Sequence, residues 1–281
     1  MKANTVAVIS DGSAVLGLGN IGAYAALPVM EGKAVLFKEF GQINAVPICL
    51  DTQDTEEIIK TIVNIAPAFG GINLEDISAP RCFEIEERLK ELLDIPVFHD
   101  DQHGTAIVVL AGIINALKVT GKQKDSCKVI VNGAGSAGIA ITKLLLTYGF
   151  SHITMCDING ILSKNSPNLN YMQKYMTEVT NLEEKEGTLA DALCGADIFI
   201  GVSAPNIVTE DMVASMNKDA ILFAMANPVP EIMPDLDKKG WCKGCRNMDA
   251  LYFPNQVNNV VAFPGIFRGA LEGRATQITE E

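Results

Sequence analysis

One segment restricts the possible folds of this chain more than any other. Apolar residues 129–131 lead directly into Asn132-Gly133-Ala134-Gly135-Ser136-Ala137-Gly138, and an apolar helix is predicted from Ile139 to Leu146. The next predicted strand ends at Asp157, roughly 20 residues after the last glycine. A strand, a G-x-G-x-x-G turn, a helix and an acid at the end of the following strand are typical of a dinucleotide-binding βαβ unit.

Each glycine of this turn has a physical role in such a unit. Gly133 permits the tight turn, Gly135 lets the backbone approach a pyrophosphate, and Gly138 allows the helix to pack on the strand. The free N–H groups at the helix N-terminus bind phosphate. The acid at the strand end accepts hydrogen bonds from the ribose hydroxyls and repels a 2′-phosphate, which favours NAD over NADP. The predicted cofactor-binding residues are Gly133, Gly135, Ser136, Ala137, Gly138 and Asp157. The alternative is a βαβ unit whose glycines serve packing only.

Strands and helices alternate on both sides of this motif. From the first strand of the motif onwards, strands are predicted at 128–132, 152–156, 196–201 and 220–225. Before it, strands are predicted at 5–9, 45–50, 71–77 and 96–98, the last of them short. Such alternation predicts an α/β protein with a doubly wound parallel Rossmann sheet and a smaller α/β domain. We expect the smaller domain, for substrate and metal, over 1–105 and the NAD domain over 106–281, with an apolar helix at 105–119 joining them.

Composition limits the partners and the compartment. The net charge of −12 argues against nucleic acid and anionic membranes as partners, because both require a basic face. The chain has no signal-peptide pattern and no run of ~18 apolar residues long enough to span a membrane. The seven cysteines lie mostly in apolar runs, as buried reduced cysteines do in the cytoplasm. Cys242 and Cys245 form a lone C-x-x-C, for which we expect neither a metal nor a redox role.

Acidic residues follow two of the predicted strands of the smaller domain. Glu75 and Asp76 end one strand, and Asp100 and Asp101 follow another, between His99 and His103. Strand ends in such a layer open onto one crevice, so these carboxylates can converge. Converging carboxylates repel one another without a cation, and hard oxygen ligands suit Mg²⁺ or Mn²⁺. The alternatives are that the acids cap helices and that the two histidines bind a softer metal or orient their neighbours.

With these residues in place, the sequence resembles malic enzymes, particularly the short prokaryotic type. The similar segments span nearly the whole chain in consistent order: 10–12, 15–22, 28–33, 71–76, 98–106, 226–228, 253–259 and 263–265. The resemblance implies oxidative decarboxylation of malate to pyruvate and CO₂, with reduction of NAD and with Mg²⁺ or Mn²⁺ as cofactor.

The resemblance also implies roles for individual residues. Glu75, Asp76 and Asp101 resemble the three metal ligands. Lys33 resembles the catalytic base and Asp100 its charged partner, although composition alone would make Lys33 an ordinary surface lysine. Three amides resemble substrate-side residues, the first of them also beside the cofactor: Asn227, Asn258 and Asn259.

Two departures from the family leave alternatives open. Family members carry an upstream segment with a tyrosine that resembles the final general acid, and we expect this chain to start after that point. Some members also have an arginine near the position of Ala14 that contacts the substrate, and this chain lacks it. A non-catalytic NAD- and metal-binding fragment and a malolactic-type enzyme are therefore alternatives. The apolar-rich start also predicts a homodimer.

Overall fold

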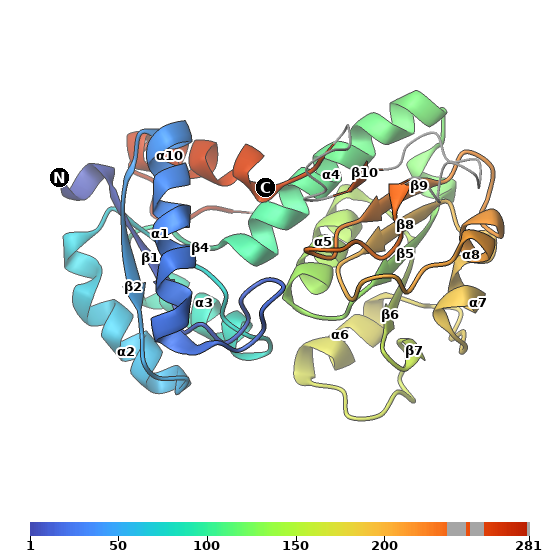
Figure 1. The fold of residues 1–281 in the computed structure, drawn as a ribbon, viewed down its shortest axis with the longest axis horizontal. Helices are drawn as coiled ribbons and strands as arrows, with labels where there is room; N and C mark the ends of the chain where they lie inside the picture. Colours follow the sequence, from blue (N-terminus) through green and yellow to red (C-terminus); the bar gives the residue numbers. More distant parts are fainter. Residues whose placement is uncertain (235–245, 248–255, 280–281) are drawn as a thin grey trace. The chain divides into compact units, whose positions relative to one another are not determined.

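The computed structural model describes residues 1–234, 246–247 and 256–279, and it divides into two compact units (Figure 1). The first unit contains Met1–Gly104 and Asn259–Glu281, and the second contains Thr105–Asn258. The break after Gly104 lies within one residue of the predicted boundary. The prediction that the second domain continues to residue 281 is wrong, because the C-terminal segment packs in the first unit.

The first unit is built on a parallel sheet of four strands. The strands are β1 (Thr5–Ser10), β2 (Asn44–Cys49), β3 (Gly71–Leu74) and β4 (Val97–His99). Their order is β2-β1-β3-β4, and all neighbours run parallel. The central strand β1 contains the continuous apolar run of residues 6–9, each 0% exposed, as expected of a strand covered on both faces.

Helices cover both faces of this sheet. They are α1 (Gly22–Gly41), α2 (Thr55–Ile65), α3 (Arg81–Leu92) and α10 (Phe263–Glu272), with short 3₁₀ helices at Lys2–Asn4, Ala66–Ala68 and Asn259–Val261. The chain runs from β1 to β2 on one side of β1 and then crosses to β3 on its other side. Because both connections are right-handed, their helices α1 and α2 lie on opposite faces of the sheet. Helix α10 packs beside α1, and α3 packs beside α2.

An aromatic cluster explains why the C-terminal segment belongs to the first unit. The ring of Phe37, on α1, lies 4.7 Å from that of Phe263 and 5.3 Å from that of Phe267, both on α10. The Phe267 ring also lies 5.7 Å from that of Phe98, on β4. All four side chains are at most 2% exposed. Three elements far apart in sequence thus share one apolar core.

The second unit has the predicted doubly wound architecture. Its strands are β5 (Lys128–Asn132), β6 (His152–Asp157), β7 (Gly160–Ile161), β8 (Ile198–Gly201), β9 (Ile221–Ala224) and β10 (Arg246–Asn247). The order is β10-β9-β8-β5-β6-β7, and only β7 runs antiparallel to its neighbour. The strand order reverses at β5, which places the binding crevice of such a sheet at the carboxyl end of that strand.

The helices of the second unit follow the same plan. They are α5 (Ser136–Tyr148), α6 (Tyr171–Val179), α7 (Leu189–Leu193) and α8 (Glu210–Ala214), with a 3₁₀ helix at Lys124–Ser126. Side chains of α7 and α8 join those of β5, β8 and β9 in one buried core cluster. The hairpin formed by β6 and β7 was not predicted, and the Asp157 Oδ1 atom accepts a hydrogen bond of 2.7 Å from the Asn159 backbone N–H in its turn.

Two element boundaries differ from prediction in ways that matter for the site. Strand β3 ends at Leu74 rather than at residue 77, because Asp76 adopts a left-handed conformation with a φ of 55° that no strand can contain. Helix α4 (Asp100–Thr120) begins five residues earlier than predicted. Asp100 and Asp101 therefore lie in the first turn of α4, where negative side chains interact favourably with the helix dipole.

Helix α4 is also, among the described residues, the one helix long and apolar enough to cross a membrane. In its most apolar 18-residue window, 44% is buried. Core helices of globular proteins pass the same test of length and composition, so this helix is weak support for a membrane span.

The aromatic cluster generates a stability prediction. Phe267→Ala removes a ring that contacts α1 and β4, and we expect a loss of about 3–5 kcal/mol in the free energy of unfolding. Urea denaturation of the two proteins measures it. Leu92→Ala on α3 is the control, because Leu92 is 58% exposed and its loss should change stability by less than about 0.5 kcal/mol. Equal effects of the two substitutions would contradict the assignment of the C-terminal helix to this core.

Candidate functional site

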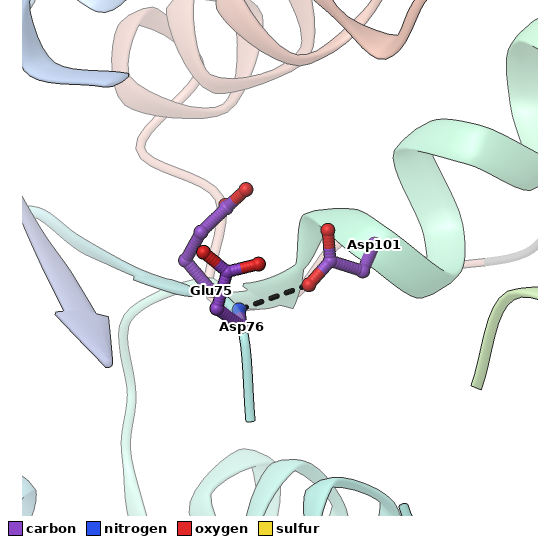
Figure 2. Close-up of side chains that lie close together, drawn as sticks. All are labelled: Glu75, Asp76 and Asp101. Carbon is purple, nitrogen blue, oxygen red and sulfur yellow. Dashed lines mark hydrogen bonds between the residues drawn. The ribbon is translucent and has the colours of Figure 1, made fainter. Parts of the chain in front are cut away.

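Three carboxylates come together where β3 ends and α4 begins. Glu75, Asp76 and Asp101 each offer an oxygen atom, and these atoms lie within 4.8 Å of one another (Figure 2). Glu75 and Asp76 are 7% and 4% exposed, and Asp101 is half-buried. The backbone N–H of Asp76 donates a hydrogen bond of 2.9 Å to Asp101 Oδ2, which links the two elements directly. The residues predicted as metal ligands therefore form one cluster.

The loop after β1 holds Asp76 in its unusual conformation. The backbone N–H of Ala14 donates to the Asp76 carbonyl at 2.9 Å, and the Ser78 N–H donates to Ser13 Oγ at 2.9 Å. The guanidinium of Arg81 contacts the hydroxyls of both serines at 3.0 Å. A left-handed non-glycine residue persists only where its surroundings fix it, so these contacts hold the backbone of Asp76 in this conformation.

Lys33 lies in the same buried region. It is 7% exposed, and its Nζ donates to Glu75 Oε1 at 2.9 Å and to Asp100 Oδ2. The Nζ atom also lies 3.9 Å from the centroid of the Phe263 ring, a favourable cation–π distance. Asn259 Nδ2 donates to the same Asp100 oxygen at 2.7 Å. Composition alone suggested a surface lysine, but the structure buries Lys33 against the acids.

Gly104 makes room for Asp100. A Cβ atom at Gly104 would lie 1.8 Å from Asp100 Oδ1, so any other residue would displace this carboxylate or the helix turn. Asp100 itself is 0% exposed, and its Oδ1 has no hydrogen-bond partner among the described residues. Its other oxygen carries both the lysine and the asparagine contacts.

The electrostatics of the cluster favour an additional cation. Burial, together with the charges of Asp101 and Glu75, raises the pKa of Asp76 to about 9. Burial also raises the pKa of Asp101 to about 6 and that of Glu75, although Lys33 opposes both. Burial disfavours the charged form of Lys33, but Asp100 and Glu75 outweigh it and hold the Lys33 pKa above its ordinary value. One lysine shared by several acids leaves negative charge uncompensated, and this set of oxygen donors fits Mg²⁺ or Mn²⁺.

The two histidines are not part of this group of acids, although His99 Nδ1 lies 4.0 Å from Asp101 Oδ2. Among the described residues, the only potential metal-binding group is the one formed by the three acids. His103 Nε2 lies 2.9 Å from Glu86 Oε2 on α3. The His99 ring is 0% exposed, and its nitrogens have no hydrogen-bond partner in the described part of the chain. The interpretation of these histidines as ligands for a softer metal is therefore not supported by the geometry.

The glycine-rich turn of the second unit connects β5 to α5. Gly133 has a φ of 117°, and a Cβ there would lie 2.5 Å from the Val202 carbonyl oxygen. A Cβ at Gly138 would lie 1.8 Å from the Gly133 carbonyl oxygen, so the first turn of α5 packs directly on the loop. A Cβ at Gly135 would meet no atom within 4 Å, so this backbone faces open space at the start of α5, before Ser136 and Ala137.

The other predicted cofactor and substrate residues lie at different places in the chain. Asp157 is the last residue of β6, and Asn227 is half-buried after β9. Asn258 is the last residue of the second unit, whereas Asn259 belongs to the first. Cys242 and Cys245 lie outside the described residues, as do residues 253–255 of the segment that resembles the family.

Sequence reasoning missed several residues that support these sites. Asn73 Nδ2 donates to Glu75 Oε2 at 2.8 Å, and the spacing of two along a strand was a signal that could have revealed it. In the second unit, the buried Glu231 accepts hydrogen bonds from the backbone N–H groups of Ser203 and Ala226, which follow β8 and β9. No local sequence pattern predicts the contacts of Glu231.

Comparisons with known proteins find similar sequences and structures over the whole chain. The profile of the malic enzyme N-terminal domain matches residues 1–90, and that of the malic enzyme NAD-binding domain matches residues 102–234. The chain is 58% identical to an NAD-dependent malic enzyme of Geobacillus stearothermophilus and 58% identical to a bifunctional malic/malolactic enzyme of Bacillus subtilis. A crystal structure of an NAD-dependent malic enzyme from Thermotoga maritima superposes with a TM-score of 0.96 at 52% identity.

These relatives are longer than the chain. The alignments cover 100% of this chain in both curated relatives but 58% of the Geobacillus protein and 68% of the Bacillus protein. The Thermotoga comparison covers 99% of this chain and 74% of that structure.

The raised carboxyl pKa values predict how a cation affects stability. A carboxyl group whose folded-state pKa lies above its unfolded value of about 4 destabilises the fold as pH rises through that interval. With a pKa of about 9 for Asp76, the cation-free protein should lose stability from this source up to about pH 9. A bound cation removes the repulsion, so Mn²⁺ should raise the Tm more at pH 8.5 than at pH 6.

Calorimetric scans with Mn²⁺ and with EDTA at the two pH values provide the measurement. Asp76→Asn is the control, because asparagine tolerates the left-handed backbone but lacks the charge. In this variant, the increase in Tm that Mn²⁺ causes should differ less between the two pH values. A Tm that Mn²⁺ does not change at either pH would show that the cluster binds no cation.

Proposed function

The chain belongs to the malic enzyme family, and we propose that it oxidises malate to pyruvate and CO₂ with NAD and a divalent cation. One observation carries this proposal: the acid cluster of Glu75, Asp76 and Asp101 lies directly beside the buried Lys33–Asp100 pair. This arrangement offers a cation site and a proton acceptor that share one residue, Glu75. Malate oxidation requires both functions at neighbouring atoms.

Glu75, Asp76 and Asp101 would hold the cation, because their oxygens are close together, largely buried and short of positive charge. Bound there, Mg²⁺ or Mn²⁺ would act as a Lewis acid that lowers the pKa of the malate hydroxyl and stabilises the enolate left by the loss of CO₂. The backbone of Asp76 keeps Asp101 in place through its N–H group.

Lys33 is the proposed base for the C2 hydroxyl of malate. It must lose its own proton first, and two carboxylates oppose that loss in the cation-free protein. If Glu75 served as a cation ligand, it would stabilise the charged lysine less. Asp100 then remains as the partner that orients the amine, while Asn259 fixes Asp100 through a 2.7 Å hydrogen bond. Asn227 and Asn258 are proposed as further amides that contact the substrate.

The second unit would bind the dinucleotide at the start of α5. The N–H groups near Ser136 and Ala137 would bind the pyrophosphate, and Gly135 leaves its approach open. Asp157 would accept hydrogen bonds from the adenine ribose, and Asn227 would contact the nicotinamide side. NAD, when bound, accepts the hydride from C2 of malate.

A second candidate function has its own support. The Bacillus subtilis relative is named a bifunctional malic/malolactic enzyme and is 58% identical to this chain. A malolactic reaction would release lactate instead of pyruvate from the same substrate. Product analysis by chromatography distinguishes the two, because only the malic reaction accumulates NADH with pyruvate.

The assembly and location are also proposals. We propose a homodimer, because α1 exposes large apolar side chains, with Tyr24 84%, Val35 64% and Phe40 64% exposed. We propose a cytoplasmic location, because the cysteines of the described residues are free rather than disulfide-bonded, as is usual in that compartment.

The central test compares two variants with the parent chain. The parent should form NADH and pyruvate from malate when Mn²⁺ is present. Asp101→Ala removes a ligand, so both Mn²⁺ affinity and turnover should fall sharply. Lys33→Ala should still bind Mn²⁺ and NAD but lose malate oxidation, while it retains some decarboxylation of added oxaloacetate.

Calorimetric Mn²⁺ titration and NADH absorbance measure the two properties separately. Unchanged Mn²⁺ binding in Asp101→Ala would place the metal elsewhere, and full malate oxidation by Lys33→Ala would place the base elsewhere. A parent chain that binds both ligands without turnover would favour the non-catalytic alternative.

The cofactor preference is tested at Asp157. A carboxylate at the end of β6 repels the 2′-phosphate of NADP, so the parent should bind NAD more tightly. Asp157→Ala should narrow the difference between the two affinities, because it weakens the binding of NAD and removes the repulsion of the 2′-phosphate of NADP. Fluorescence titration with the two reduced cofactors gives both affinities. Equal or tighter binding of the phosphorylated cofactor by the parent would rule out this role for Asp157.

A further inference from the structure

Another buried carboxylate contacts the chain on both sides of Asp100 and Asp101. Glu86, on α3, is 4% exposed. Its Oε1 accepts a hydrogen bond of 3.0 Å from the backbone N–H of His99 and pairs with Lys90 Nζ at 3.0 Å. Its Oε2 lies 2.9 Å from His103 Nε2 and 3.4 Å from Gln102 Nε2. None of these contacts has a role in the chemistry proposed above.

The residues that Glu86 contacts surround the two functional acids. His99 directly precedes Asp100, and Gln102 directly follows Asp101. One carboxylate therefore holds the chain on both sides of the pair, at the end of β4 and in the first turn of α4. Asp100 and Asp101 direct their own side chains to Lys33 and to the Asp76 backbone, so neither contacts α3, to which Glu86 ties the same turn.

Glu86 is suited to hold this turn as an anion. Burial disfavours its charged form, but the hydrogen bond and charge of His103 and the charge of Lys90 outweigh it and lower the Glu86 pKa to about 2. Hydrogen bonds to a buried charge are stronger than neutral ones, and the remaining partners are costly to leave unpaired. A neutral residue of similar shape would hold the same turn less firmly.

We propose that Glu86 is a positioning residue for the metal and base sites, which fixes the first turn of α4 so that Asp101 faces Glu75 and Asp76 while Asp100 faces Lys33. This inference rests on the proposed cation site and deepens it. Supporting groups behind metal ligands commonly contribute about 10- to 100-fold to metal affinity.

The experiment measures Mn²⁺ affinity by calorimetry in the full 281-residue chain, without malate or NAD. Glu86→Gln should bind Mn²⁺ about 10- to 100-fold more weakly than the parent. Glu87→Gln, exposed on the same helix, is the matched charge control and should bind as the parent does. Leu89→Ala is the stability control, because Leu89 is 0% exposed on α3. It should lower the Tm without weakening Mn²⁺ binding.

A double substitution tests the route of the effect. If Glu86 acts through Asp101, then Glu86→Gln should weaken Mn²⁺ binding far less in an Asp101→Asn background than in the parent. Parent-like Mn²⁺ binding by Glu86→Gln would overturn this inference alone, as would an equal weakening in Leu89→Ala. A parent chain that binds no Mn²⁺ would overturn the proposed cation site, and this inference with it.

Discussion

Repulsion between buried carboxylates is the constraint on which the first unit depends. Glu75, Asp76, Asp100 and Asp101 lie at one edge of a sheet, where water screens their charges poorly. Among the described residues, Lys33 is the buried lysine that contacts them. An uncompensated buried charge costs several kcal/mol, so these acids lower the stability of the cation-free fold. Buried groups with such shifted pKa values mark a candidate functional site.

The surrounding structure is arranged to tolerate this repulsion. The loop after β1 holds Asp76 in a left-handed conformation, and Gly104 leaves space for the Asp100 carboxylate. Asn73 donates a hydrogen bond to Glu75 from the same face of β3. The acids therefore keep fixed directions despite their charge. A site of this kind is preorganised for the proposed cation, because little rearrangement would be needed if one bound there.

The sequence predicted those features that depend on local backbone geometry or on strand order. The turn from Gly133 to Gly138 was predictable because each glycine meets a steric requirement within one βαβ unit. The convergence of Glu75, Asp76 and Asp101 was predictable because parallel strands end at a common edge, although the roles of these acids came from the family resemblance. The burial of Lys33 was not predictable from composition, since it depends on how α1 packs against β1, β2 and α10.

Two other features were missed because they arise from contacts between distant segments. The segment from Asn259 was assigned to the wrong domain, because nothing in its local pattern reveals that Phe263 packs on Phe37. Glu86 was overlooked because an acid in an amphipathic, charged helix usually faces water. Its burial becomes evident only when β4 and α4 are placed against α3.

The division of the first unit into two separate stretches of sequence also has a consequence for biosynthesis. Residues 1–104 leave the ribosome long before Phe263, Phe267 and Asn259 are made, so the nascent first unit lacks one wall of its core and the amide that holds Asp100. The intervening second unit is continuous in sequence and can complete its own core first, because domains fold as units during synthesis. Assembly of the acidic cluster beside its lysine therefore waits until residues 259–267 have been made, and until then Phe37 and Phe98 lack their ring partners on α10.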